Sequence, residues 1–157
     1  MKPNIGITEI NLEHSAELLS EVLANEMTLY VKTRKFHWNI SGESFMELHK
    51  LFEEQYKKLE ASTDEIAERI GKLGQRTIGT MHEFSKLSSI KENPAIYTDS
   101  TEMLRELLKD HETHIILLRK DVNDCSEGNK DAGTADFLTG LMEQHETIAR
   151  ILRRYLN

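Results

Sequence analysis

Apolar residues recur every three or four positions along most of the chain, which is the pattern of helices that bury one face. The first such run begins near Asn11, a favourable N-cap, and extends to about residue 38. A second run is expected over residues 43–73, ending just before Gly74. Only residues 39–42 separate the two runs. A connection this short predicts two long antiparallel helices.

The second half of the chain repeats this pattern after a long interruption. Periodicity fails over residues 74–99, although residues 83–90 fit a short helix. A third helix is expected through residues 104–122, capped by Ser100 or Thr101, and a fourth through residues 138–155. Four helices with one connection long enough to cross the bundle have the ferritin-like topology. The predicted fold is therefore all-α, a ferritin-like four-helix bundle whose long crossover between helices 2 and 3 carries a short extra helix.

Length and charge narrow the classes of function. The 157 residues fit a single domain over 1–157, with residues 1–10 as a short N-terminal tail. We expect a cytoplasmic protein without a membrane segment, because no stretch has the length and apolar character of a span and the start lacks a leader pattern. The single Cys125 fits a reducing compartment, and the sequence leaves its role open. The formal charge of −7 disfavours nucleic acid as a partner and favours cations.

One face of the second helix gathers metal-binding side chains. With His49 at zero and 100° per residue, Glu53, Asp64 and Glu68 fall at about 40°, 60° and 100°. The apolar stripe of the same helix lies about 120° from this face. The potential ligands therefore flank the core and do not fill it.

Axial distance limits how these residues act together. His49 and Asp64 are separated by roughly 22 Å along the helix, so one chain cannot close one site. A two-fold axis near residues 58–59 would place His49 and Glu53 of one subunit beside Asp64 and Glu68 of the other. The sequence thus suggests two identical metal sites per dimer.

A structural interpretation of the same residues stays open. His37 continues the apolar stripe of the first helix and fits a hydrogen-bonded core histidine, and the carboxylates fit a solvated face. Against this, Asp64 and Glu68 are like charges at i, i+4, a spacing that costs stability unless a cation lies between them. Imidazole with carboxylate suits iron(II). None of the seven histidines follows a glutamate by three residues, which disfavours an intra-bundle di-iron centre.

Nearly the whole chain resembles the Dps-type miniferritins, named for the DNA-binding protein from starved cells. The resemblance is most specific in K-F-H-W-N-I-S-G-E-S-F-M-E-L-H-K-L-F-E-E, followed by D-E-I-A-E-R-I. It implies that His37, His49 and Glu53 of one subunit and Asp64 and Glu68 of its two-fold partner are ferroxidase ligands for iron. Trp38, otherwise an interface or core aromatic, matches a tryptophan that donates electrons beside the site.

The resemblance also implies an assembly and an activity. These are a hollow homododecamer with tetrahedral symmetry, oxidation of iron(II) preferentially by hydrogen peroxide, and storage of ferric mineral, which together protect the cell from oxidative damage. The acidic residues Glu127, Asp131 and Asp136 resemble those of the three-fold entry pores, with Asp136 in the matching segment T-A-D-F-L. Helix capping is the alternative role for this acidic cluster.

The chain departs from the DNA-binding members of that family. Those proteins commonly carry a lysine-rich tail, whereas Lys2 is the only base before the first helix here. Twelve copies would carry a formal charge of about −84, which repels DNA at moderate salt. The favoured function is a ferroxidase and storage cage, and the alternative is a nucleoid-associated protein whose iron chemistry is incidental.

Overall fold

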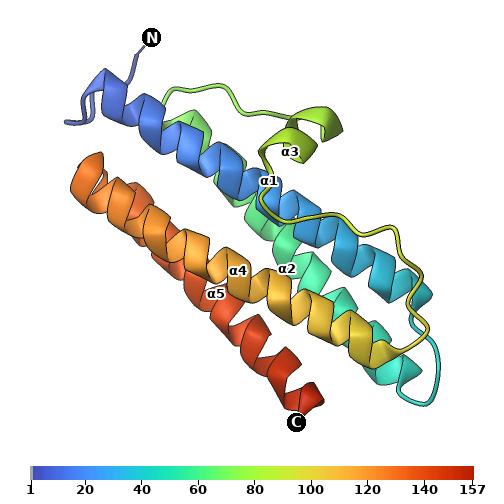
Figure 1. Cartoon of the computed structure of the whole chain (residues 1–157). Helices are drawn as coiled ribbons and strands as arrows, with labels where there is room; N and C mark the ends of the chain where they lie inside the picture. Colours follow the sequence, from blue (N-terminus) through green and yellow to red (C-terminus); the bar gives the residue numbers. More distant parts are fainter. Residues whose placement is uncertain (1) are drawn as a thin grey trace.

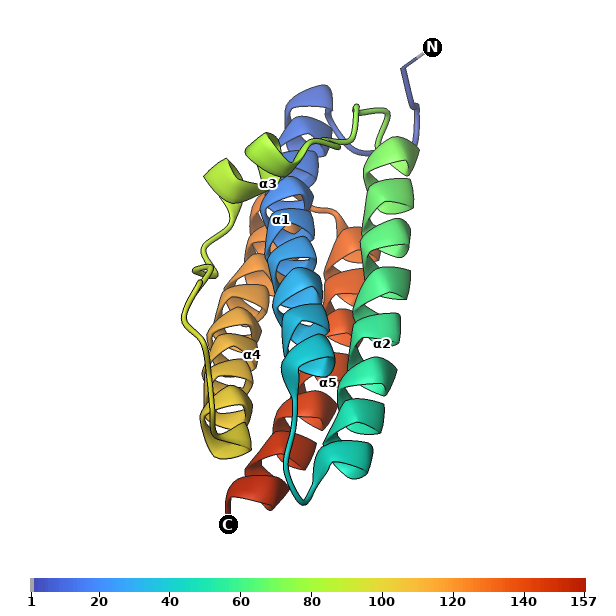
Figure 2. The ribbon, with the colours of Figure 1, turned by 90° about the vertical axis from the view of Figure 1, so that its right-hand side faces the viewer.

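The computed structural model describes residues 2–157, and within that range all regular structure is helical. Helix α1 (Glu9–Asn39) and helix α2 (Phe45–Lys72) form an antiparallel hairpin. A crossover containing the short helix α3 (Met81–Leu87) then runs along the outside of the bundle to the start of α4 (Ser100–Asn123). A π-helical turn, η1 (Asp124–Gly128), leads into α5 (Ala132–Leu156), which returns antiparallel to α4 (Figures 1 and 2). The predicted four-helix bundle with a long crossover is confirmed.

The helix ends correct three details of the sequence prediction. Helix α1 begins at Glu9 and is capped by Thr8, whose side chain accepts a hydrogen bond from the backbone N–H of Asn11. Helix α4 is capped by Asp99, not by Ser100 or Thr101. Helix α3 begins two residues earlier than expected because Thr80 and Glu83 form a reciprocal capping box. In each case a side chain just outside the apolar run satisfies the free N–H groups.

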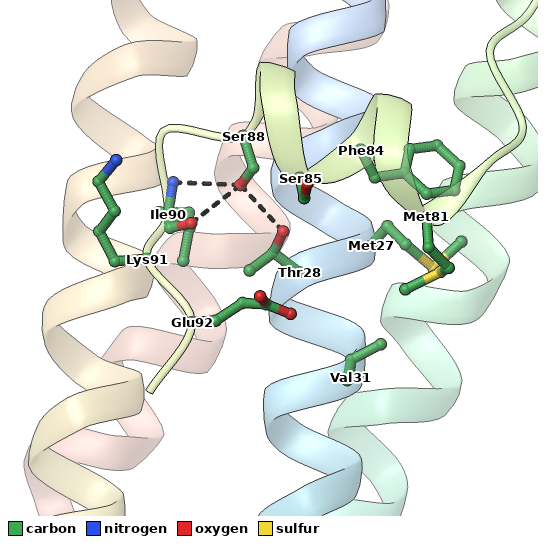
Figure 3. A pocket seen from close by; sticks show the side chains of 10 residues that line it. All are labelled: Met27, Thr28, Val31, Met81, Phe84, Ser85, Ser88, Ile90, Lys91 and Glu92. Carbon is green, nitrogen blue, oxygen red and sulfur yellow. Dashed lines mark hydrogen bonds between the residues drawn. The ribbon is translucent and has the colours of Figure 1, made fainter. Parts of the chain in front are cut away.

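Hydrogen bonds attach the crossover to the outer face of α1. Figure 3 shows the hydroxyl of Ser88 at the centre of this attachment, where it accepts from the Thr28 hydroxyl at 2.9 Å and from the Ile90 backbone N–H at 3.2 Å. The buried Lys32 ammonium donates to the Lys91 carbonyl at 2.8 Å and also pairs with Glu106 on α4. The crossover therefore has fixed partners along much of its length.

This covering makes α1 the most enclosed helix of the bundle. It packs against α2 on one side and α4 on another, while α3 covers its outer face. Its fully buried positions include Leu19, Val22, Leu29 and Phe36, together with the charged Glu26. Within residues 2–157 no helix is both long and apolar enough to cross a membrane.

Candidate metal centre

The histidines His37 and His49 meet where α1 and α2 are joined by their short loop. Gly42 makes this turn possible with a φ of 99°, which favours glycine. The two imidazole rings stack with centroids 3.8 Å apart and planes 22° from parallel. His37 Nδ1 lies 2.8 Å from the His49 carbonyl oxygen, and His49 Nδ1 lies 3.0 Å from the His37 carbonyl oxygen. Each histidine is thus fixed by the backbone of the other.

These reciprocal bonds determine the tautomer of both rings. A carbonyl oxygen can only accept, so Nδ1 of His37 and of His49 must each carry a proton. In a neutral imidazole the other nitrogen, Nε2, then has a free lone pair. Metal-binding histidines commonly donate the second ring N–H to a carbonyl in this way, which orients the ring. The pair is therefore preorganised to offer two nitrogen ligands to a metal ion.

Glu53 lies one turn beyond His49 on α2 and is half-exposed. Its carboxylate accepts a hydrogen bond from the Lys57 ammonium at 2.5 Å. This bond is the main cause that lowers the pKa of Glu53, and the nearby imidazoles of His37 and His49 lower it further. The carboxylate is therefore ionised and already has a cationic neighbour. An exposed lysine is easily displaced by a more highly charged metal ion.

Asp64 and Glu68 lie farther along α2 and point to solvent. The helix continues from Phe45 to Lys72 without a break. The axial separation of roughly 22 Å between His49 and Asp64 therefore holds in the folded chain. One chain brings His37, His49 and Glu53 together and leaves Asp64 and Glu68 apart, so joining the two groups requires a second subunit.

Trp38 sits beside the histidine pair with 66 % of its surface exposed. Arg34, one turn earlier on α1, places its guanidinium 5.8 Å from the Trp38 ring and 4.1 Å from the Tyr56 ring. Tyr56 in turn meets His37 edge-to-face at 5.2 Å. Tyr56 is a buried position of α2. In the structure it belongs to an aromatic group that borders the candidate ligands.

The three acidic residues before and within the start of α5 have different environments. Asp131 is only 1 % exposed, and its carboxylate caps α5 by accepting from the backbone and hydroxyl of Thr134. It also pairs with Arg69 of α2 at 3.3 Å. Glu127 and Asp136 are exposed. Capping is therefore observed for Asp131, while Glu127 and Asp136 remain open to solvent.

A second histidine cluster lies in the core, away from the loop. His111 and His114 of α4 and His145 of α5 are completely buried. Sequence reasoning missed their partner Glu26, to which His114 and His145 both bind. The available signal was the spacing of Leu19, Val22, Glu26 and Leu29 on α1, which places a charged residue in an apolar register.

Comparisons with known proteins agree with this architecture. A family model described as a ferritin-like domain matches residues 16–157. An uncharacterized low temperature-induced protein of Nostoc sp. is 44 % identical over 98 % of this chain and 86 % of its own length. DNA protection during starvation protein 2 of Bacillus anthracis is 36 % identical over 90 % of this chain and 95 % of its own. The crystal structure of the Dps protein from Vibrio cholerae O1, described as a member of the ferritin-like diiron-carboxylate proteins, has a TM-score of 0.92 and 29 % identity, covering 99 % of this chain and 97 % of that one.

Proposed function

Because the chain belongs to the ferritin-like family and, within it, to the Dps-type miniferritins, we propose that it oxidises iron(II) at sites shared between two subunits. Family membership supports iron binding, iron storage and protection from oxidative damage. The finer assignment is that His37, His49 and Glu53 of one subunit and Asp64 and Glu68 of its two-fold partner bind two iron ions. Iron is the substrate and the stored product.

The observation that carries this proposal is the reciprocal bonding of His37 and His49. Two carbonyl oxygens fix both Nδ1 protons, so both Nε2 lone pairs are available without any rearrangement. Neither Nε2 has a hydrogen-bond partner among the described residues, and neither is among their buried unpaired atoms, so both are accessible to an incoming ion. The pair thus offers one open nitrogen per ring next to an ionised glutamate.

Hydrogen peroxide is the oxidant that we propose. Two iron(II) ions each give one electron, and peroxide with two protons accepts both electrons to form two water molecules. This pairing breaks the O–O bond without releasing hydroxyl radical. Trp38 lies beside the site with its ring exposed, and we assign it the role of an electron donor that limits the escape of radicals.

A closed dodecamer with tetrahedral symmetry is the assembly that fits this function. The shared site requires a two-fold interface, and storage requires an enclosed space. Glu127 and Asp136 are exposed near the start of α5 and are proposed to line entry pores for iron(II). Asp131 is proposed to hold this pore segment in place through its cap and its bond to Arg69.

Anaerobic titration with iron(II), followed in separate samples by peroxide and by air, tests the activity. We expect fast oxidation with about two iron ions consumed per peroxide, as the electron balance requires, and slower oxidation by air. Oxidation by peroxide that is no faster than in protein-free buffer would contradict the proposed activity. Light scattering on the same samples should give a dodecamer, whereas a monomer or a 24-subunit shell would contradict the proposed assembly.

A further inference from the structure

Three helices of a single chain bring a carboxylate and three imidazoles together in the bundle core. Glu26 comes from α1, His111 and His114 from α4, and His145 from α5. All four side chains have 0 % exposure. One ligand atom each from Glu26, His114 and His145 can be chosen so that these atoms lie within 4.8 Å of one another.

The hydrogen bonds of this core cluster leave two polar atoms unused. Glu26 Oε1 lies 2.5 Å from His145 Nε2 and 3.0 Å from His114 Nε2. His111 Nδ1 and His145 Nδ1 are 2.8 Å apart. Among the described residues, Glu26 Oε2 and His111 Nε2 are buried and have no hydrogen-bond partner. Buried polar atoms are rarely left in this state, so these two indicate that a group is missing from the cluster.

The pKa shifts in the cluster run in the direction that favours metal binding. Burial raises the pKa of the Glu26 carboxyl, but the nearby His145 and His114 outweigh burial and hold this pKa well below its usual value. Burial lowers the pKa of both His111 and His114. These shifts favour an ionised carboxylate and neutral imidazoles at His111 and His114. Metal ions bind carboxylates and neutral imidazoles.

We propose that Glu26, His114 and His145 bind one divalent first-row transition-metal ion, iron(II) or zinc(II), inside each subunit. Two imidazoles and one carboxylate with open positions are a ligand set used for both ions. The ion takes the place of the protons that now lie between Glu26 and the two Nε2 atoms. It also gives the unused oxygen of Glu26 a partner.

Metal binding changes the tautomers of His145 and His111, while each ring keeps one proton. The Nε2 proton of His145 leaves to water that enters with the ion, and the Nδ1 proton of His111 passes to His145 Nδ1 across the 2.8 Å contact. His111 takes a proton from water at Nε2. For His114 the proton moves to Nδ1, where the contact with the Asn25 amide nitrogen is long, at 3.4 Å, and little is lost by giving it up.

This core site is distinct from the proposed intersubunit site. Glu26 and His37 are on the same helix and are separated by about 16 Å along it. Every ligand of the core site comes from one chain, so binding there does not depend on the two-fold interface. It also differs from the Glu-x-x-His centre that the sequence disfavoured, because α4 supplies His-x-x-His instead.

Crystallography of the unaltered protein tests the proposal directly. The protein is expressed with iron and zinc in the medium, crystallised anaerobically, and measured at the absorption edge of each metal. We expect an anomalous peak about 2.0–2.3 Å from the ligand atoms of Glu26, His114 and His145. A peak at either edge supports the proposal and identifies the metal. The absence of both peaks from the core, at metal concentrations that fill surface carboxylates, overturns it.

Metal content provides an independent measurement. In a background of Asp64→Asn and Glu68→Gln, which damages the proposed intersubunit site, Glu26→Gln and His145→Asn should each lower the metal bound per chain by about one ion. The matched controls Glu17→Gln and His14→Asn change the same residue types on the exposed side of α1 and should retain the ion. Equal metal content in folded core variants and controls overturns the proposal. If the core variants do not fold, the anomalous maps decide.

Discussion

The His37–His49 pair and the core cluster around Glu26 use the same side chains under opposite conditions. At the loop, backbone carbonyls hold one nitrogen of each ring and leave the other free. In the core, imidazoles bond to a carboxylate and to one another, with no contact to solvent. A carbonyl cannot exchange a proton with the ring, whereas another imidazole can. The loop pair is therefore fixed in one state, and the core cluster can shift protons internally.

The carboxylates of these two regions, Glu53 and Glu26, also have different hydrogen-bond donors. Glu53 pairs with Lys57, which is on the surface and can turn away. Glu26 pairs with His114 and His145, which are completely buried and cannot turn away to solvent. Surface pairs contribute little to stability, while breaking a buried pair is costly. The loop pair is thus suited to exchanging ions, and the core cluster to holding the helices together.

The largest effect is expected from removing the charges of Asp64 and Glu68, the carboxylates that a second subunit would add to the His37–His49 pair. Asp64→Asn with Glu68→Gln should lower the rate of iron oxidation by peroxide at least about 100-fold, because these substitutions keep the size of each side chain but remove the charge that offsets iron. Stopped-flow absorbance measures the rate. Glu60→Gln, an exposed residue on the same helix, should behave like the parent.

Mixed subunits test whether the site is shared. A His37→Ala/His49→Ala chain assembled with an Asp64→Asn/Glu68→Gln chain gives heterodimers with one intact and one damaged site. Partial recovery of activity is expected. Verified heterodimers that remain as inactive as both parents would show that the site is not intersubunit.

The next effect concerns stability and belongs to the core cluster. Glu26→Ala should lower the free energy of unfolding by about 3–5 kcal/mol, because it leaves buried imidazoles without their acceptor. Glu53→Ala should leave stability close to that of the parent, since its carboxylate is at the surface. Urea unfolding at a fixed protein concentration compares the two variants. A similar loss of stability in both variants would contradict the difference between the buried and the surface carboxylate.

Asp121 on α4 shows what burial does to a carboxyl without imidazole partners. Burial raises its pKa to about 6, and the nearby Glu21 and Asp124 act in the same direction. Because the folded state binds the proton more tightly, the contribution of Asp121 to stability is present below about pH 4 and is lost as pH rises through about 6. Asp121→Asn should therefore stabilise the protein by about 1 kcal/mol at pH 8, where solvent partly screens the ionised carboxylate. At pH 4 the substitution should change the stability little. Thermal unfolding at the two pH values measures the difference.

A smaller effect is expected from Lys57. Lys57→Met removes the cation that competes with iron for Glu53, so iron(II) should bind about two- to five-fold more tightly at the loop pair. Anaerobic calorimetry measures the affinity. Lys58→Met, also exposed but outside the Glu53 pair, is the control. Weaker binding in the Lys57 variant would mean that Lys57 orients Glu53 and does not compete for it.

We expect the protein to have no measurable effect on the gel mobility of DNA. At physiological salt the Debye length is about 8 Å, and the formal charge of −7 per chain repels the phosphate backbone of DNA. Gel mobility of a DNA duplex should be unchanged by the assembled protein. Retardation under these conditions would favour the nucleoid-associated alternative over a function in cation chemistry.

The sequence predicts the loop region better than the core. Short spacing and one helical face are enough to place His49 and Glu53 together, because both are properties of a single element. The Glu26 cluster joins residues about 90 to 120 positions apart, and its members look like ordinary core positions when each helix is considered alone. The caps at Thr8 and Asp99 were missed for another reason, since several neighbouring residues have similar capping ability and only the folded backbone selects one.

The contact between Arg69 and Asp131 links two distant parts of the proposed iron path. Arg69 follows Glu68 directly on α2, and its guanidinium reaches the carboxylate that caps α5. Gly133 leaves room for this reach, because a Cβ there would lie 2.7 Å from Arg69 Nη2. The part of α2 that carries Glu68 is therefore held against the segment that carries Asp136. Iron entry and iron oxidation would then both depend on the Arg69–Asp131 contact, so a substitution that breaks this contact would impair both steps.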